Sequence, residues 1–194
     1  MKLFDDTILN DVFDTVVTEI KVNEIMIPAI VTNGALNKND EQESKHIHTV
    51  QKVNQGDVVE HEGSKYLIVT ESISKRHNKY KNIMEHFNAA LNVVGATTRV
   101  IVDYDDLGRP IYDDIEEMYE VPCVIGFNRI GSPNNTGGLM VIENSLMAKI
   151  PKNDDNVLYV KVNNEYTVEG KKYKVSHIDN VQTGLLIVQM DYVV

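Results

Sequence analysis

The chain has 194 residues, of which 42% are hydrophobic and 25% charged, and its formal net charge is −10. This composition is that of a globular protein and excludes a disordered chain. The balance of 19 basic against 29 acidic residues argues against general binding to the phosphate backbone of nucleic acids, which requires a basic excess. A local basic patch at Lys75-Arg76-His77 through Lys81 is an alternative, but we interpret this segment as a solvated loop and the start of a helix. Cys123 is the only cysteine, so an intrachain disulfide framework is excluded.

The first residues contain no apolar run of the kind found in signal peptides, and no stretch approaches the roughly 18 apolar residues of a membrane span. We therefore expect a protein that is made in a cytoplasm and has no membrane partner. Residues 5–17 carry apolar side chains at helical spacing, which predicts a short amphipathic N-terminal helix.

Residues 18–31 are rich in β-forming side chains, and the polar residues 34–44 predict a loop. His46 and His48 alternate with Ile47 and Thr49, as strand residues do. The two imidazoles would share one face of the strand and could bind zinc, but no third ligand is near them in the sequence. We interpret them as strand residues.

A stretch of the chain occurs twice. The pattern Glu62-Gly63-x-Lys65-Tyr66 matches Glu169-Gly170-x-Lys172-Tyr173 at an offset of 107, which is 170 minus 63. Each copy predicts a β-hairpin with the glycine in its turn. A Lys-Val-Asn sequence precedes each copy, at 52–54 and at 161–163, if two residues of slippage are allowed. The chain is therefore predicted to be two related β modules in tandem.

Between the copies, residues 79–93 have apolar side chains at helical spacing and predict an amphipathic helix. Residues 97–104 alternate as a strand, and a turn around Gly108 leads into a returning strand at 111–114. A linker is expected near 113–120. The strand that follows contains Pro122 and precedes a polar loop at 131–138, as Pro28 precedes the loop at 34–44.

Candidate catalytic or metal-binding residues are few. Asp103, Asp105 and Asp114 have part of the spacing of a calcium loop, but Leu107 occupies a ligand position, so we interpret the segment as an acidic hairpin turn. Cys123 lies in an apolar strand and is expected to be buried and inert. The carboxylates at 113–117 are adjacent in sequence and do not indicate an acid and base pair. We expect no enzymatic activity, no metal and no cofactor.

The second half has its elements in a recognisable order: Val121-Pro-Cys-Val-Ile, a polar loop, 147–151, Val168-Glu-Gly-Lys-Lys-Tyr-Lys-Val175 and Thr183-Gly-Leu-Leu-Ile-Val-Gln-Met190. Over residues 121–194 it resembles the small β-barrel head-completion or stopper proteins of tailed bacteriophages. The first half matches more loosely, through Gly63-x-Lys-Tyr-Leu-Ile-Val69. The sequence leaves open whether the chain is a stopper, an adaptor or a tail-side ring protein.

This resemblance implies a virion protein of the head-to-tail connector, or neck. Such proteins form homo-oligomeric rings of six or twelve copies between a portal or adaptor protein and a tail-terminator or tail-tube protein, and they retain packaged DNA without sequence specificity. One flexible loop from each subunit converges on the channel. The candidate channel or inter-subunit residues here are Gly34, Asn37, Lys38, Asn39, Asn134, Asn135, Thr136 and Gly137.

Two other functions remain open: another phage tail or baseplate component, and a small ligand-binding or metal-binding β-barrel. The expected fold is mainly β with minor α, as two tandem small β-barrel or sandwich modules with an N-terminal helix and a helix after the first module. The expected domains are residues 1–115 and 116–194.

Overall fold

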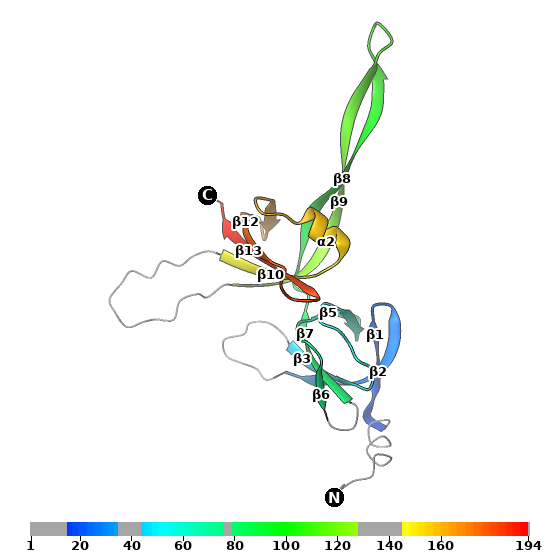
Figure 1. Ribbon diagram of the computed structural model, residues 1–194, viewed down its shortest axis with the longest axis vertical. Coiled ribbons are helices and arrows are strands. Elements are labelled where there is room, and N and C mark those ends of the chain that lie inside the picture. The colour runs from blue at the N-terminus through cyan, green and yellow to red at the C-terminus, as the bar shows by residue number, and fades with distance from the viewer. Residues whose placement is uncertain (1–14, 35–43, 76–78, 128–144, 194) are drawn as a thin grey trace, which may run out of the picture.

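Two β-sheets follow one another along the chain in the computed structural model of the protein (Figure 1). The structure describes residues 15–34, 44–75, 79–127 and 145–193. The first sheet contains β1 (Thr18–Val22), β2 (Ile25–Asn33), β3 (Ser44–Thr49), β4 (Val58–His61), β5 (Ser64–Ile68), β6 (Ile73–Lys75) and β7 (Lys79–His86). The second contains β8 (Ala89–Tyr104), β9 (Pro110–Phe127), β10 (Ser145–Pro151), β11 (Glu165–Val168), β12 (Lys171–Asp179) and β13 (Leu185–Tyr192), with the helix α2 (Asp154–Tyr159) between β10 and β11. The mainly β fold predicted from the sequence is confirmed.

The first sheet closes into a small barrel, which we call module 1. Its strand order is β3-β2-β1-β4-β5-β7-β6, and β3 pairs in addition with β7. Six strands therefore form a ring. The short β6 pairs with the first half of β7, while β5 pairs with its second half.

The second sheet, module 2, has the order β11-β12-β13-β10-β9-β8, and its edge strands β11 and β8 contact each other. The order of strands around this barrel is the same as in module 1. The strands β8, β9, β10, β11, β12 and β13 correspond to β1, β2, β3, β4, β5 and β7. The prediction of two related β modules in tandem is confirmed.

The correspondence extends to single backbone hydrogen bonds. The Gly56 N–H donates to the Ile68 carbonyl at 2.8 Å, and the Asn163 N–H donates to the Val175 carbonyl at 2.9 Å. Both residues of the second bond lie 107 positions after those of the first (163 minus 56, 175 minus 68). The structural repeat therefore has the offset of the hairpin pattern and needs no slippage, so the alignment of the two Lys-Val-Asn sequences was wrong.

The two matched hairpins have the same turn. Glu62 and Gly63 have φ angles of 51° and 76°, and Glu169 and Gly170 have 49° and 76°. Two successive positive φ angles are those of a type I′ turn, whose twist suits a two-residue β-hairpin. The predicted Glu-Gly hairpins are confirmed in both modules.

The proline-containing strands are also equivalent. Ala29 pairs with Thr18, the first residue of β1, and Cys123 pairs with Ala89, the first residue of β8. Each follows a proline and is fully buried. The predicted correspondence of these strands is confirmed, and the polar segments that follow them both connect the second strand of a module to its third.

Each barrel has its own hydrophobic core. The core of module 1 is a cluster of ten buried hydrophobic residues, and that of module 2 is a larger cluster that includes Leu91, Val121 and Met190. Tyr66 and Tyr173 are equivalent and buried, and each ring makes an edge contact, with His86 and Tyr192 respectively. Burying apolar area in this way supplies most of the favourable free energy of folding.

The predicted helix at 79–93 is wrong. This segment forms β7 and the first part of β8, joined at residues 87–88. The buried side chains of β7, Asn82 and Met84, and those of β8, Leu91 and Val93, alternate with period two. The same residues fit a helical spacing by sequence alone, but pairing of β7 with β3, β5 and β6 decides for the strand.

Two other expectations concern the ends of the modules. The N-terminal helix at 5–17 falls mainly on residues 1–14, outside the described residues, and only Thr15 and Val16 are helical within them. The expected division at 115/116 and the linker at 113–120 fall inside β9, which pairs with β8 over much of its length. The strand pairing changes from one sheet to the other at residues 87–88.

The modules differ most in the connection between their first two strands. In module 1, Val22 pairs with Ile25 across the two-residue turn 23–24. In module 2, Val93 pairs with Tyr119, and residues 94–118 form a long two-stranded ribbon with its turn at Gly108. This hairpin extends away from both barrels (Figure 1). The predicted hairpin around Gly108 is confirmed, although it is much longer than expected.

Candidate functional site

Most of the predicted loop residues lie outside the described residues: Asn37, Lys38, Asn39, Asn134, Asn135, Thr136 and Gly137. Gly34 is described, and its N–H donates to the Ser44 carbonyl at 2.9 Å, which continues the pairing of β2 with β3. The two loops therefore begin and end at equivalent strands, β2 and β3 in module 1, β9 and β10 in module 2.

The modules meet at a closely packed junction. Gly56 packs directly on the backbone of Gly184, and a Cβ on either residue would overlap a carbonyl of the other module. The Gln55 side chain donates to that of Gln182 at 2.8 Å. Lys152 fixes the loop that carries Gly184, because its ammonium donates to the carbonyls of residues 180 and 182 at 2.7 and 3.1 Å.

An ion pair and a small apolar cluster complete the junction. The Lys149 ammonium of β10 lies 2.8 and 2.7 Å from the two carboxylate oxygens of Glu85 in β7. The two side chains are only 27% and 15% exposed, so the pair is partly shielded from water. Leu67 of module 1 and the pair Val124 and Leu185 of module 2 pack together and are fully buried or nearly so.

The hairpin 94–118 exposes an unusual amount of apolar surface. Nine of the nineteen large hydrophobic side chains that are exposed among the described residues lie on it: Val94, Ile101, Val102, Tyr104, Leu107, Ile111, Tyr112, Ile115 and Met118. Leu107, beside the turn, is 74% exposed, and Tyr104 is 61% exposed. The nine side chains lie on both faces of the ribbon, since Ile101 pairs with Tyr112 on one face and Ile115 pairs with Thr98 on the other. Exposed apolar side chains gathered in such number mark an interaction surface.

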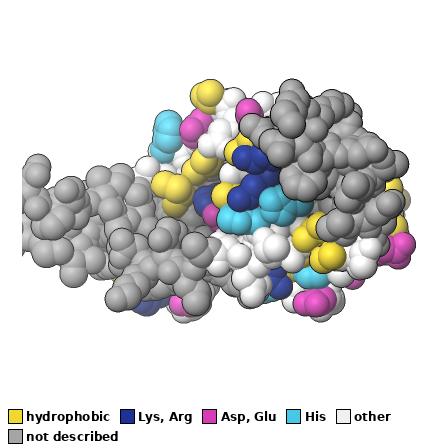
Figure 2. Space-filling model, turned by 90° about the horizontal axis from the view of Figure 1, so that it is seen from below, with side chains coloured by type: hydrophobic (Ala, Val, Ile, Leu, Met, Phe, Trp, Pro, Cys, Tyr) yellow, Lys and Arg dark blue, Asp and Glu magenta, His cyan; other side chains and the backbone are white. Residues whose placement is uncertain are grey.

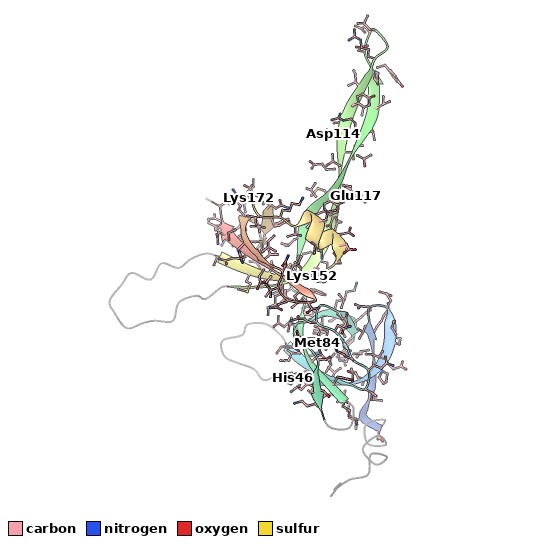
Figure 3. All side chains as sticks on the ribbon, viewed as in Figure 1. His46, Met84, Asp114, Glu117, Lys152 and Lys172 are labelled. Atoms are coloured by element: carbon pink, nitrogen blue, oxygen red, sulfur yellow. The ribbon has the colours of Figure 1, made fainter. Side chains whose placement is uncertain are left out.

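The acidic residues of the hairpin are held locally. One Asp105 carboxylate oxygen accepts from the N–H groups of Leu107 and Arg109 at 2.9 and 2.7 Å, which shapes the turn. Asp114 accepts two hydrogen bonds from the Arg99 guanidinium on the opposite strand, at 2.9 and 3.3 Å. Figure 3 shows Asp114 and Glu117 on this ribbon, far from the barrel of module 1. The interpretation of residues 103–114 as an acidic hairpin turn is confirmed.

His46 and His48 lie in β3, as predicted, on the outer surface of module 1. In the neighbouring strand β7, His48 pairs with Lys81, and Lys81 pairs in turn with Ile73 of β6. Burial lowers the pKa of both imidazoles, and the nearby Lys81 lowers it further. Within the described residues, no group of three metal-binding side chains is close enough to hold an ion.

A basic surface surrounds these histidines. Residues that pair side by side across β3, β7 and β6 place His46, His48, Lys75, Lys79 and Lys81 on one face of the sheet, which we call the Lys/His face. All of the charges that shift the pKa of His48 are cationic, namely Lys81, His46 and Lys75. In Figure 2, basic and histidine side chains gather beside apolar ones on the side of the molecule seen from below.

Cys123 is fully buried in the core of module 2, and burial raises the pKa of its thiol to about 12. The thiol is therefore not a nucleophile in the native protein, as the sequence predicted. No helix among residues 15–34, 44–75, 79–127 and 145–193 is long and apolar enough to cross a membrane.

Sequence reasoning missed the hairpin as a surface. The available signal for the hairpin was that no glycine, proline or asparagine interrupts residues 111–121. The lysines of the Lys/His face have a local signal, the basic patch from Lys75 through Lys81, but only the barrel brings them beside His46 and His48.

The comparisons with known proteins give one match. The family model of the YomX N-terminal domain matches residues 2–86, and this family is associated with bacteriophages. Residue 86 is also the last residue of β7. The matched region therefore ends where module 1 ends. No curated protein and no solved structure matches the chain.

Proposed function

We propose that the chain is a structural protein of the bacteriophage head-to-tail connector. In this proposal, copies form a ring that joins the portal or adaptor protein to the tail-terminator or tail-tube protein and retains packaged DNA. The observation that carries it is the hairpin 94–118, which exposes nine large apolar side chains outside both barrels. An isolated two-stranded ribbon is marginally stable in water, so the hairpin is suited to be covered by another chain.

The match of module 1 to a phage-associated family supports the phage origin in this proposal. The resemblance of residues 121–194 to stopper proteins supports the place in the virion. The two barrels and their tight junction, in which Gly56 lies on Gly184, form a stiff body that could transmit load between neighbours in a ring.

The segments 35–43 and 128–144 are the proposed channel loops. They connect equivalent strands in the two modules, β2 to β3 and β9 to β10. The net charge of −10 suits a channel through which DNA passes, because like charges repel phosphate. DNA would then be a neighbour of the ring and not a specifically bound ligand.

The test is a stop mutation in the gene for this protein, in the phage that encodes it. The proposal expects filled heads that lack tails and lose their DNA, together with separately assembled normal tails. A suppressor strain that restores the full chain is the control, and antibody labelling of wild-type particles should mark the neck.

Other outcomes are decisive as well. Normal particles without the protein would overturn the proposal. Defective tails on sealed, filled heads, with antibody label on the tail, would replace it with a tail or baseplate role.

A further inference from the structure

The hairpin carries a strong local charge in addition to its apolar surface. Residues 94–118 contain two basic side chains, Arg99 and Arg109, and seven acidic ones, so the local net charge is −5. The acidic residues are Asp103, Asp105, Asp106, Asp113, Asp114, Glu116 and Glu117. A partner for this ribbon must therefore combine apolar contacts with positive charge, because burying unpaired carboxylates costs free energy.

The Lys/His face of module 1 has these properties. Lys75 and Lys81 supply two positive charges, and the two histidines add further charge when protonated. Ile73, at the start of β6, is 55% exposed next to Lys81. The strand β6 pairs only with β7 among the described strands, so its other edge offers backbone N–H and carbonyl groups to a further strand.

The two surfaces belong to different modules and lie far apart in one molecule. In Figure 1 the ribbon of β8 and β9 is at the top and β6 is near the bottom, on the opposite side of the junction. The tight junction prevents the modules from folding onto each other, because Gly56 and Gly184 are in backbone contact. A hairpin cannot therefore reach the Lys/His face of its own chain.

Symmetric pairing of two hairpins is disfavoured, because it would bring together two surfaces of charge −5. A contact between unlike surfaces of identical chains is heterologous and repeats from copy to copy, and it gives a closed ring if the rotation between copies closes.

We propose that the hairpin 94–118 of one copy docks on the Lys/His face of module 1 of a second copy. This inference deepens the proposed function, since it names the contact through which the ring would form. The apolar side chains of the ribbon cover Ile73 and its neighbours, and its carboxylates pair with Lys75 and Lys81. The contact is weakened by salt because it depends on exposed charges.

The test uses the full-length chain and two charge-reversed variants. One carries Lys75→Glu and Lys81→Glu on the Lys/His face, and the other carries Asp113→Lys and Glu117→Lys on the hairpin. Sedimentation over roughly 10 µM to 1 mM should show self-association of the wild type that weakens with salt. Each variant alone should associate at least about tenfold more weakly, whereas an equal mixture of the two should recover association, because the reversed charges match again.

A second mixture separates a head-to-tail contact from any other. In a hairpin-deleted variant, residues 94–118 are replaced by the two residues Asn-Glu that form the turn of module 1. This variant keeps the Lys/His face, and the Lys75→Glu and Lys81→Glu variant keeps the hairpin. Their mixture should give one-to-one complexes and nothing larger, since each copy has one working surface. In every variant, a Cys123 thiol that does not react with a labelling reagent shows that the protein is folded.

Three results would overturn the inference: a wild type that remains monomeric up to 1 mM at low salt, folded variants that associate as the wild type does, or mixtures that recover nothing. Loss of binding to a duplex DNA in the face variant, with self-association unchanged, would assign the face to nucleic acid instead. If the wild-type chain self-associates as expected but particles form normally without it, the proposed function is overturned and this inference is not. If the protein is in the neck but both charge-reversed variants associate as the wild type does, this inference is overturned and the proposed function is not.

Discussion

Modules 1 and 2 have the same strand order, but one connection differs greatly between them. The first two strands of module 1 are joined by the turn 23–24, and those of module 2 by the ribbon 94–118. The pairs that flank the connection, Val22 with Ile25 and Val93 with Tyr119, are equivalent in the two barrels. The barrel thus specifies its own register, and a surface for other chains can be added at a turn without changing the core.

A second difference lies at one equivalent position. Gly56 and Asn163 both have a positive φ, 90° and 75°, and both donate the same backbone hydrogen bond. Gly56 faces the backbone of Gly184, whereas Asn163 is exposed. The turn needs only a residue that tolerates the left-handed region, which asparagine does, and the close approach of the other module is what requires glycine.

The largest expected effect tests this difference directly. Gly56→Ala should lower the free energy of unfolding by about 2–5 kcal/mol, because the new Cβ adds left-handed strain and overlaps the Gly184 backbone. Asn163→Ala, the matched control, should cost about 1–2 kcal/mol, because it adds the left-handed strain without the overlap. Denaturant unfolding checks both values, and similar losses in the two variants would contradict this account of the junction.

The next largest effect concerns the ion pair across the junction. Glu85→Gln should cost about 1–3 kcal/mol, because it leaves the partly buried Lys149 ammonium without its charged acceptor. Asp191 is the equivalent residue of module 2, at the exposed end of β13, and Asp191→Asn should change stability by less than about 0.5 kcal/mol. Thermal and denaturant unfolding measure both. A loss in Glu85→Gln as small as that in Asp191→Asn would show that the ion pair does not stabilise the junction.

The smallest effect is a difference in acid sensitivity between the modules. His46 and His48 correspond to Met147 and Lys149 in module 2. Burial, with Lys81, lowers the pKa of both histidines in the folded state, so the unfolded chain binds protons more readily than module 1 does. The stability of module 1 is therefore complete above the ordinary histidine pKa of about 6.5 and falls as the pH drops from there through the lowered values.

Thiol labelling can follow each module separately. Cys123 reports opening of module 2, and Ala29→Cys in a Cys123→Ala background places a thiol at the equivalent buried position of module 1. Below pH 6.5 the labelling of module 1, corrected for the thiolate fraction, should rise more than that of module 2. His46→Gln with His48→Gln should remove the excess. An equal rise in both modules, or an unchanged excess in the double variant, would contradict the prediction.

The sequence predicted the structure best where the local geometry allows only one conformation. The Glu-Gly hairpins were predictable because a two-residue β-hairpin needs positive φ angles, and the strands with Pro28 and Pro122 were found by their equal order in the two halves. The segment 79–93 was misassigned because its apolar residues fit two periodicities, and only partners distant in the sequence decide between them. The expected channel residues other than Gly34 lie outside the described part of the chain. The lysines of the Lys/His face form a local basic pattern at 75–81, but their place beside His46 and His48 depends on the pairing of β3 with β7, which no local pattern contains.

The hairpin also sets a length. Between the pair Val94–Met118 and the pair Tyr104–Pro110, the ribbon spans on the order of 25 Å, at about 3.3 Å for each of the eight steps along β9. Because it is inserted at a turn, adding or removing one cross-strand pair changes the reach of the chain by a single rise and leaves both barrels unaltered. The ribbon is in this sense a spacer of adjustable length, by which the distance between a barrel and whatever the tip touches can be tuned independently of the fold.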